Sequence, residues 1–412
     1  MPLCGKMEYV QCLKNNMKKS HLYLIDEVCK GSQYGVKTYM NLIRGCAIYF
    51  HQFTVVLLSV KDKDLCVFQD KGIRYINIPQ IAIDKSSYYR RCFYILSFYI
   101  NPKEANIAHF NYINSKELST ALKEKLGFKI VLTWHYNYWK DWIETANLLR
   151  LLRMSEGELD ILPEVEKIKR EKVEESGGML KAFDKIITVC KETYDELQQV
   201  YGLPVNQLTL IHNPVRSLKR MNDYVVPNKK NIICVGRIDY NKNVELLVEA
   251  FIELHKKRDD IRLIIVGGGV YDNAISCIGL NYQDICFTGM LNKEELEVIY
   301  KIAHVGVTLS WHEEGPLVAL EMMQHGIPVI GSRTGILPEL IEDGKNGYLV
   351  DLVWKQNDFN IQPVVEKLEA VLSAPDYLQM RQHAIDSVDK RFSYELFKEK
   401  MTGLYEELVN SD

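Results

Sequence analysis

The chain has 412 residues, of which 47% are hydrophobic and 25% charged, and its formal net charge is -3. This length and balance indicate a globular protein with two ordinary α/β domains, and the small net charge argues against nucleic-acid binding through a broad basic surface. No run approaches the ~18 apolar residues of a membrane span, and the N-terminus has no apolar signal core. We therefore expect a cytoplasmic protein that acts on small molecules.

The N-terminal stretch and the cysteines support the same class. Residues 1–20 are polar and basic, so we expect a disordered or non-native extension; the fold begins near Met17, and whether residues 1–16 are native stays open. The ten cysteines are scattered and form no C-x-x-C pair. Several lie in apolar runs, which is typical of reduced core residues in a cytosolic protein.

The first half of the chain alternates strand-like and helical runs. Because its strand-like runs are continuously apolar, the alternation predicts a buried parallel sheet flanked by helices. These runs are HLYLID (21–26), FTVVLLSV (53–60), RYINI (74–78), ANIAHF (105–110), FKIVLTWH (128–135), DKIITVC (184–190) and LTLIHNPV (208–215).

Two segments of this half have two interpretations each. Residues 140–182 carry opposite charges at helical spacing, which favours a solvated helix, although a role in gripping a second substrate stays open. Residues 86–100 combine Arg90 and Arg91 with many aromatic residues. A buried helix of the first domain is the favoured interpretation, and a peripheral contact at the inner face of the membrane is the alternative.

The pattern then starts again. A polar segment around 214–229 separates the two halves, and the second half has strand-like runs NKKNIICVGRI (228–238), IRLIIVGGG (261–269), DICFTG (284–289), VGVTLS (305–310) and IPVIGS (327–332). We predict an α/β fold of two Rossmann-like, doubly wound domains, residues 21–215 and 216–391, that face each other across a cleft. The amphipathic end, about 392–412, is expected to pack back on the first domain.

Two cations follow the first strand of the second half. Arg237 and Lys242 lie in the loop before a helix for which Asn243 is a plausible N-cap. In a doubly wound fold this loop lies on the ligand side, and paired cations with free helix amides suit a diphosphate. Taken alone, a lysine and an arginine in a loop are more often simply solvated.

A second helix start carries acidic residues as well. In WHEEGPLVALEMM (311–323), Pro316 suits the first helical position, and the amides there attract anions. Glu313 precedes this helix and Glu321 lies on it, and carboxylates accept hydrogen bonds from hydroxyls. The apolar neighbours of Glu321 imply a largely buried helix, where a carboxylate needs partners. The expected ligand is a sugar linked through a diphosphate to a nucleoside.

These blocks together resemble a known family. The E-x7-E spacing from Glu313 to Glu321, the upstream VGRIDYNKNVELLVEAF and the downstream RTGILPELIEDGKNGYLV resemble the signature of retaining family 4 glycosyltransferases of the GT-B fold. They cover most of residues 230–350. The first domain is similar more loosely, through GSQYGVKTYMNLI, VLTWHYNYW and LIHNPV.

The resemblance implies roles for residues of the second domain. Arg237 and Lys242 neutralise the donor diphosphate, Glu313 binds sugar hydroxyls near the reacting carbon, and Glu321 binds the ribose. The backbone amides of Gly315, Leu317 and Val318 form the phosphate cradle, to which Pro316 contributes no N–H. The backbone around Cys286 and Phe287 contacts the base.

The resemblance also implies roles in the first domain. His135 contacts the transferred sugar, and Gly35 belongs to a loop that faces the phosphates and the acceptor. A histidine at a strand end, taken alone, is more often a satisfied core residue. Two departures concern glycines: Tyr34 precedes Gly35, and Thr334 precedes Gly335, where relatives often have glycine pairs. Arg333 has no assigned counterpart.

The implied activity is transfer of a hexose-type sugar from a nucleoside diphosphate sugar to an acceptor hydroxyl, in glycan, glycolipid or glycoconjugate synthesis. The sequence has no D-x-D motif, so we expect no metal and no further cofactor. The acceptor, which can be a lipid-linked glycan, a peptide or a small molecule, is unknown. A non-catalytic GT-B partner and an epimerase or phosphorylase of the same fold are the alternatives. A nicotinamide enzyme is disfavoured because IIVGGGVYD lacks the third glycine of G-x-G-x-x-G.

Overall fold

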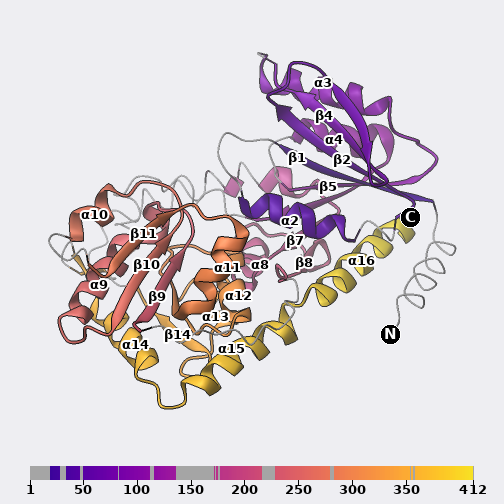
Figure 1. The fold of residues 1–412 in the computed structure, drawn as a ribbon. Helices are drawn as coiled ribbons and strands as arrows, with labels where there is room; N and C mark the ends of the chain where they lie inside the picture. The colour runs from indigo at the N-terminus through magenta and orange to yellow at the C-terminus, as the bar shows by residue number, and fades with distance from the viewer. Residues whose placement is uncertain are drawn as a thin grey trace.

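The computed structural model describes residues 19–27, 34–46, 50–81, 83–111, 116–135, 171, 173–174, 177–215, 228–278, 283–352, 354–355 and 358–411. Most of the expectations for residues 1–20 and 140–182 therefore lie outside the described residues, and Ser20, which was assigned to the extension, begins the first strand. Two separate sheets of mainly parallel strands, each with its own helices, form two α/β domains (Figure 1). This confirms the predicted fold class.

The first sheet has the order β3-β4-β2-β1-β5-β6-β7-β8. All neighbouring strands are parallel except β3 and β4, which form an antiparallel hairpin that the sequence pattern did not predict. The strands are β1 (Ser20–Glu27), β2 (Gln52–Val60), β3 (Cys66–Asp70), β4 (Ile73–Pro79), β5 (Ala105–Phe110), β6 (Lys129–Trp134), β7 (Lys185–Thr188) and β8 (Leu208–Leu210).

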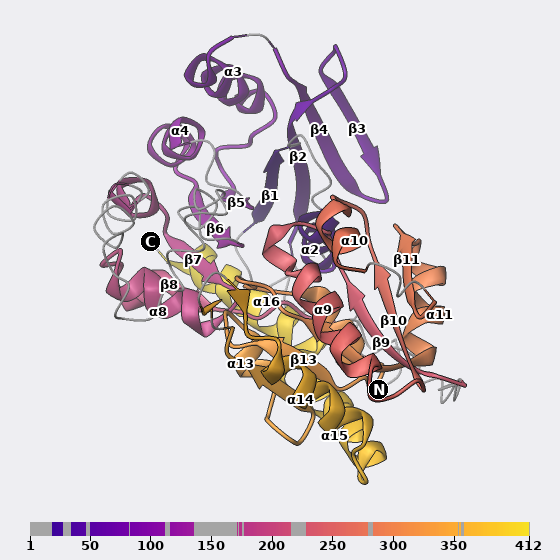
Figure 2. The same ribbon diagram turned by 90° about the vertical axis from the view of Figure 1, so that its left-hand side faces the viewer.

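Helices cover both faces of this sheet (Figure 2). The α helices described between these strands are α2 (Tyr34–Arg44), α3 (Lys85–Ser97), α4 (Lys116–Leu126) and α8 (Lys191–Gln199). Side chains of α3 and α4 pack on one face, and those of α2 pack on the other. Successive strand residues point to opposite faces, so continuous apolar runs are required. Residues 86–100 supply most of α3, which buries one face and exposes the other.

The second sheet has the order β11-β10-β9-β12-β13-β14, and all neighbouring strands are parallel. Its strands are β9 (Lys230–Val235), β10 (Ile261–Val266), β11 (Ile285–Gly289), β12 (Ala303–Thr308), β13 (Val329–Ser332) and β14 (Gly347–Val350). The described helices of this domain are α9 (Val244–His255), α10 (Asp272–Ile278), α11 (Lys293–Ile302), α12 (Leu317–Gln324), α13 (Leu337–Leu340), α14 (Gln362–Leu372) and α15 (Tyr377–Arg391). The shorter elements are the one-turn helices η2 (Val205–Gln207) and η3 (Tyr240–Lys242) and the two-residue strands β15 (Trp354–Lys355) and β16 (Asp358–Phe359).

The last helix, α16 (Tyr394–Asn410), runs from the second domain to the first (Figure 1). Its buried side chains Phe397, Met401 and Tyr405 join the same core cluster as α2 and the first sheet. The Tyr405 hydroxyl lies 2.6 Å from Nδ1 of His109 on β5. The end of the chain is therefore part of the first core.

The cysteines correct one expectation. Cys46, Cys92, Cys190 and Cys234 are buried and free, as core residues should be, but other described cysteines are not. Cys66 on β3 and Cys286 on β11 are exposed. Both lie on strands at a sheet edge, where an apolar run has one side open to solvent.

Candidate functional site

The centre of the candidate site is an ion pair between two strand-end loops. Lys242 ends η3, which follows β9, and Glu313 follows the neighbouring strand β12. Lys242 Nζ lies 2.6 Å from Glu313 Oε2, and the two side chains are only 14% and 12% exposed. Because adjacent parallel strands end at the same sheet edge, the fold brings together two side chains 71 residues apart.

Asparagines hold these two loops against each other. The Asn241 carbonyl accepts from Trp311 N at 2.9 Å, and its side chain exchanges hydrogen bonds of 3.2 Å with the backbone of His312. Asn243 occupies the N-cap position of α9, but its side chain donates to the Leu309 carbonyl at 2.7 Å and makes no cap bond. The expected N-cap position is therefore confirmed, but with a φ of 48° the Asn243 side chain serves the loop contact in place of a cap bond.

Arg237 is in the same loop but not in the ion pair. Its side chain is 72% exposed, and its guanidinium lies 3.4 Å from Asp239. Gly236, just before it, has a φ of 152°, and a Cβ there would lie 3.5 Å from Lys242 Cε. The backbone of this loop thus lies beside Lys242 while the Arg237 side chain points to solvent.

The triple glycine after β10 packs against this loop. A Cβ on Gly267 would collide with the Gly236 carbonyl, and one on Gly269 would collide with the Ile238 carbonyl. Only glycine allows two backbones to approach so closely. The VGGG stretch therefore has a packing role beside Lys242.

Helix α12 begins next to Glu313. Pro316 occupies the N-cap position, one residue before the first helical position that was expected for it, and it makes no side-chain cap bond. Ala319 N donates to the Pro316 carbonyl at 3.1 Å, whereas the amides of Leu317 and Val318 come before the first intrahelical bond. These two donors carry the positive end of the helix dipole. An anion bound at these two amides would be near the Lys242–Glu313 ion pair, because Glu313 precedes Leu317 by only four residues.

Glu321 lies further along α12 and faces α11. Tyr300 of α11 donates a hydrogen bond of 3.1 Å from its hydroxyl to Glu321 Oε2, which is the partner that a half-buried carboxylate requires. Burial raises the pKa of Glu321 above its ordinary value. In the described part of the chain, no hydrogen bond or ion pair joins Glu321 to Lys242 or Glu313.

Cys286 and Phe287 lie on β11, the edge strand of the second sheet. Among the described strands, β11 pairs only with β10, so the backbone groups on its other edge are available to hydrogen-bond a ligand. The Phe287 ring packs edge-on against Tyr271, with the centroids 5.5 Å apart. This arrangement suits the flat base that was expected here.

His135 follows β6 in the first domain. Its ring meets Tyr39 of α2 edge-on at 4.4 Å, and its buried Nε2 has no hydrogen-bond partner among the described residues. Burial lowers the pKa of His135 to about 3, so its imidazole is neutral at physiological pH. Gly35 lies in the first turn of α2, one turn before Tyr39, and not in a loop. Residues 28–33, which precede it, lie outside the described residues.

Comparison with known proteins adds to this geometry. The model "Glycosyltransferase Family 4" matches residues 35–217, and "Glycosyl transferases group 1" matches residues 219–390. The chain belongs to the family 4 glycosyltransferases. This family 4 chain is 26% identical to an uncharacterized glycosyltransferase of Methanocaldococcus jannaschii, over 57% of this chain and 66% of the relative. It spans between 40% and 66% of the length of three such curated relatives.

Solved structures confirm the GT-B fold. A sucrose-phosphate synthase of Thermosynechococcus elongatus superposes with a TM-score of 0.71 and 19% identity, covering 95% of this chain and 100% of that one. HepE of Anabaena, solved in complex with UDP and glucose, superposes with a TM-score of 0.66 and 13% identity, covering 95% and 99%. At these identities the likeness concerns the fold alone.

The two domains of this family 4 chain contact each other through four residues to which the sequence analysis assigned no role, and through the carbonyl of Gly315. Glu339, after β13, accepts from Lys191 N at 2.6 Å and lies 2.9 Å from His212 Nε2. Asn213 Nδ2 donates to the Gly315 carbonyl at 3.1 Å. His212 and Asn213 lie in LIHNPV, and Glu339 lies in the G-x-x-E segment. The motifs identified these residues, but the sequence did not show that they contact each other, because they are more than 100 residues apart.

Gly335 belongs to the same contact. A Cβ on Gly335 would collide with the Glu313 carbonyl, and Ile336 N donates to that carbonyl at 3.0 Å. Gly335 N itself donates to Glu192 of α8 at 2.5 Å. Glycine at this position, with a φ of 56°, therefore determines where Glu313 lies. Its neighbour Arg333 is placed elsewhere, 3.0 Å from Asp351 on the surface.

Proposed function

We propose that this chain transfers a sugar from a nucleoside diphosphate sugar to an acceptor hydroxyl, with retention of configuration. The observation that carries the proposal is the Lys242–Glu313 pair directly before the uncapped amides of α12. A cation and two free amides suit the diphosphate, and the second carboxylate oxygen of Glu313 suits a sugar hydroxyl. Family membership supports the reaction type.

In this proposal, each site residue contacts a different part of the donor. Lys242 and the amides of Leu317 and Val318 stabilise the charge that grows on the leaving phosphate, and the exposed Arg237 adds to it after leaving Asp239. Glu321 accepts from the ribose hydroxyls, and the backbone of Cys286 and Phe287 meets the base. These groups offset the diphosphate charge without a metal ion. The neutral His135 accepts or donates a hydrogen bond at its buried Nε2 toward the transferred sugar.

The retaining step that we propose is front-face attack. The acceptor oxygen forms a bond to the anomeric carbon on the side where the bond to the phosphate oxygen breaks, and that phosphate oxygen takes the acceptor proton. Glu313 is held by Lys242, so it serves binding and not covalent catalysis. The direct test is whether the transferred sugar keeps its anomeric configuration by NMR, with an inverted product contradicting the step.

The first experiment is a thermal-shift panel of nucleoside diphosphate sugars, followed by assays of hydrolysis and transfer with EDTA present. UDP-glucose goes first, because HepE was solved with UDP and glucose. A donor at 100 times its Kd should raise the stability of the chain by roughly 2.7 kcal/mol. Stabilisation without turnover of any donor would support a non-catalytic GT-B partner, and a new nucleotide sugar formed without acceptor would support an epimerase.

We propose a peripheral membrane contact for the exposed side of α3. No helix in the described residues has the length and apolar character needed to cross a bilayer. On α3, however, Arg90 and Arg91 are exposed, and Tyr94 is 63% exposed beside them. Cations with an aromatic residue suit an anionic lipid surface. Cosedimentation with anionic vesicles should fall strongly for Arg90→Ala with Arg91→Ala, and equal binding to neutral vesicles would contradict the contact.

A further inference from the structure

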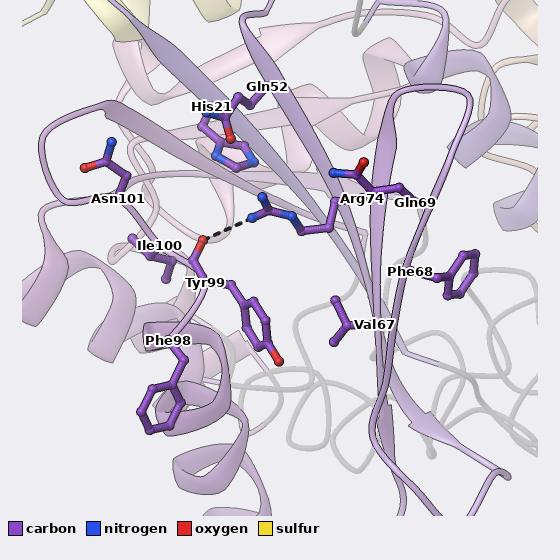
Figure 3. Close-up of a pocket in the computed structure, with 10 residues that line it drawn as sticks. All are labelled: His21, Gln52, Val67, Phe68, Gln69, Arg74, Phe98, Tyr99, Ile100 and Asn101. Atoms are coloured by element: carbon purple, nitrogen blue, oxygen red, sulfur yellow. Dashed lines mark hydrogen bonds between the residues drawn. The ribbon is translucent and has the colours of Figure 1, made fainter.

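A cavity of about 560 Å³ lies in the first domain, away from the candidate site. It is located at the amino ends of β1 and β2, whereas the ligand side of a doubly wound sheet is at the carboxyl ends. The β3–β4 hairpin forms one wall, and the segment 98–101 between α3 and β5 forms the other (Figure 3). A second hollow of about 290 Å³ shares His21, Gln52, Gln69 and Arg74 with it.

Arg74 of β4 extends into the space between the two walls (Figure 3). Its Nη1 donates to the Tyr99 carbonyl at 3.3 Å, which fixes the guanidinium across the cavity. Among the described residues, no carboxylate lies within ion-pair distance of it. The remaining N–H groups of a guanidinium are arranged as a planar fork that matches a carboxylate or a phosphate.

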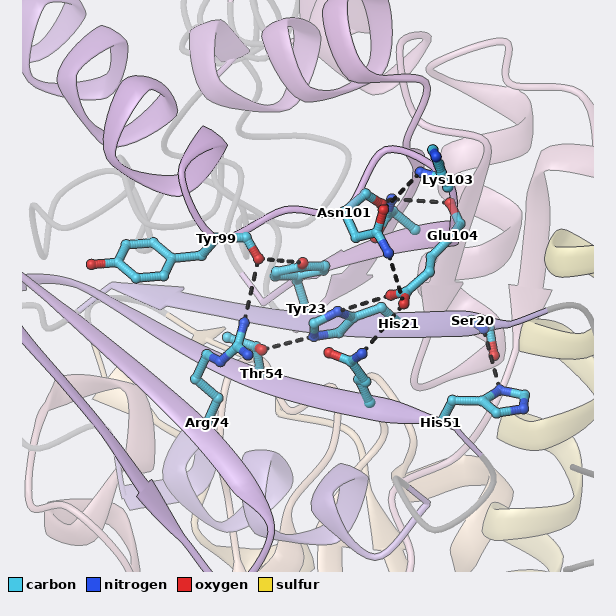
Figure 4. A network of polar contacts seen from close by, with 12 residues as sticks. Ser20, His21, Tyr23, His51, Thr54, Arg74, Tyr99, Asn101, Lys103 and Glu104 are labelled. Atoms are coloured by element: carbon cyan, nitrogen blue, oxygen red, sulfur yellow. Dashed lines mark hydrogen bonds and ion pairs between the residues drawn. The ribbon is translucent and has the colours of Figure 1, made fainter.

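The base of the cavity is formed by a buried histidine, with the Glu104 carboxylate behind it. The His21 ring stacks on Tyr23 at 4.0 Å, its Nε2 lies 2.8 Å from Thr54 Oγ1, and its Nδ1 faces Glu104 at 3.6 Å (Figure 4). Burial, with a smaller effect from Arg74, lowers the pKa of His21 to about 3. His21 is therefore neutral at physiological pH, and Arg74 is the cation among the residues that line the cavity.

Amides and aromatic rings complete the lining. Asn101 Nδ2 donates to Glu104 Oε1 at 3.1 Å (Figure 4). Gln52 Nε2 donates to the same oxygen at 3.3 Å, so both amides are held in place. Amide groups can donate and accept, as hydroxyls do. Phe98 is 84% exposed at the rim, and Tyr99 lies beside it. The negative face of an aromatic ring attracts the C–H groups of a sugar ring.

We infer that this cavity binds a sugar unit that carries one oxyanion, such as the carboxylate of a uronic acid, against Arg74. One guanidinium matches one negative charge, whereas a diphosphate brings more charge than Arg74 offsets. The amides and the rim aromatics match the hydroxyls and the C–H face of the sugar. The inference does not depend on the proposed function, because the candidate donor site is in the second domain. The cavity itself lies at the amino end of β1, whose eight residues extend roughly 25 Å to the carboxyl edge of the first sheet.

The test is a ligand-observed NMR titration of the full chain with glucuronate, glucose 6-phosphate, glucose and inorganic phosphate. We expect glucuronate to bind at least tenfold more tightly than glucose, and Arg74→Gln to lose at least tenfold of that affinity. Glucose 6-phosphate shows whether a phosphate oxyanion serves equally well. Because Arg74 also holds the Tyr99 carbonyl, the milder Gln69→Ala, which changes the neighbour of Arg74 on the β3–β4 wall, is tested too, with a smaller loss expected.

Two controls make the outcome decisive. Lys103→Gln removes an exposed cation near the cavity that does not line it, and Lys242→Met disables the candidate donor site; both should leave glucuronate affinity unchanged. Equal binding of glucose and glucuronate would overturn the inference, as would inorganic phosphate binding as tightly as the sugars. So would an equal loss in Lys103→Gln, or no binding of any probe. A loss in Lys242→Met alone would assign the signal to the donor site.

Discussion

The two domains share one architecture but carry different chemistry at their strand ends. In the second domain, Lys242, Glu313 and Glu321 place ionisable groups around α12. In the first domain, His135 and His109 are buried and kept neutral beside Tyr39 and Thr133. We infer that the second domain offsets the negative charge of the donor, while the first domain supplies hydrogen bonds from neutral groups and a surface that excludes water. Substitutions that change the charged groups of the second domain or the neutral histidines of the first domain test this difference.

Lys242→Met should have the largest effect. Removing the cation beside the developing phosphate charge should lower the transfer rate by about 10²–10³-fold. The matched control is Lys256→Met, which changes a lysine with a 65% exposed side chain and should leave the rate unchanged.

Lys242→Met also leaves Glu313 without its cation, so its Tm should fall in a thermal-shift assay. The double variant Lys242→Met with Glu313→Gln should recover stability but not activity. A double variant that recovers full activity would show that the pair is only structural.

Gly335→Ala should have the next largest effect. The added Cβ would collide with the Glu313 carbonyl at a φ of 56°, so the loop must shift and Glu313 with it. Displacement by about 1 Å can cost up to 10²-fold in rate, and we expect a loss of roughly 10–100-fold in kcat/KM.

Gly344→Ala is the matched control for this strain. Gly344 has a φ of 76° but its nearest neighbour is the Tyr348 side chain at 3.8 Å. Both variants should lose some stability from the left-handed backbone, of about 1–2 kcal/mol, as measured by denaturant unfolding. If Gly335→Ala and Gly344→Ala lose activity equally, the contact between Gly335 and the Glu313 carbonyl does not contribute to activity.

Acid should destabilise the first domain through its histidines. Burial lowers the pKa of His21, His109 and His135 to about 3, below the ordinary value of 6.5. The unfolded chain therefore takes up protons that the folded chain does not. This stability is complete above pH 6.5 and is lost progressively as the pH falls toward 3.

The measurement is the free energy of unfolding between pH 7.5 and 5. His109→Gln should flatten this pH dependence, even if it lowers stability at pH 7.5 by breaking the bonds to Thr133 and Tyr405. His383→Gln, whose imidazole bond to the Lys345 carbonyl is exposed, should retain the dependence of the unmodified chain. An unchanged slope in His109→Gln would mean that other groups cause the acid sensitivity.

Glu321→Gln should have the smallest effect, a stabilisation in the absence of ligand. Burial raises the pKa of Glu321, so its favourable contribution exists below the unfolded value near 4.5 and is lost as the pH rises. At pH 7.5 an amide that keeps the Tyr300 bond should therefore raise Tm by about 1–2 °C. Glu366→Gln, at an exposed site on α14, should not change Tm. A lower Tm for Glu321→Gln would contradict the cost assigned to burial.

The sequence predicted much of the fold but less of the site. The apolar runs located, approximately, twelve of the thirteen strands that have a parallel neighbour, and they missed β14. Their alternation with helices was still sufficient to predict the doubly wound class. The hairpin partner β3 was missed because its residues are exposed and show no apolar run. The spacing of Glu313 and Glu321 identified the helix, whereas nothing local indicated that Tyr300 would satisfy Glu321.

By itself, the sequence determined most of the segments that become strands, that two domains form, and which loops carry cations and carboxylates. Those properties depend on apolar periodicity and on residue type, which are local. Only the tertiary structure decided that Lys242 pairs with Glu313, that Arg237 faces solvent, and that Glu339 meets His212 across the domains. The physical reason is that strand order and domain packing determine which distant loops meet, and these depend on contacts spread over the whole chain.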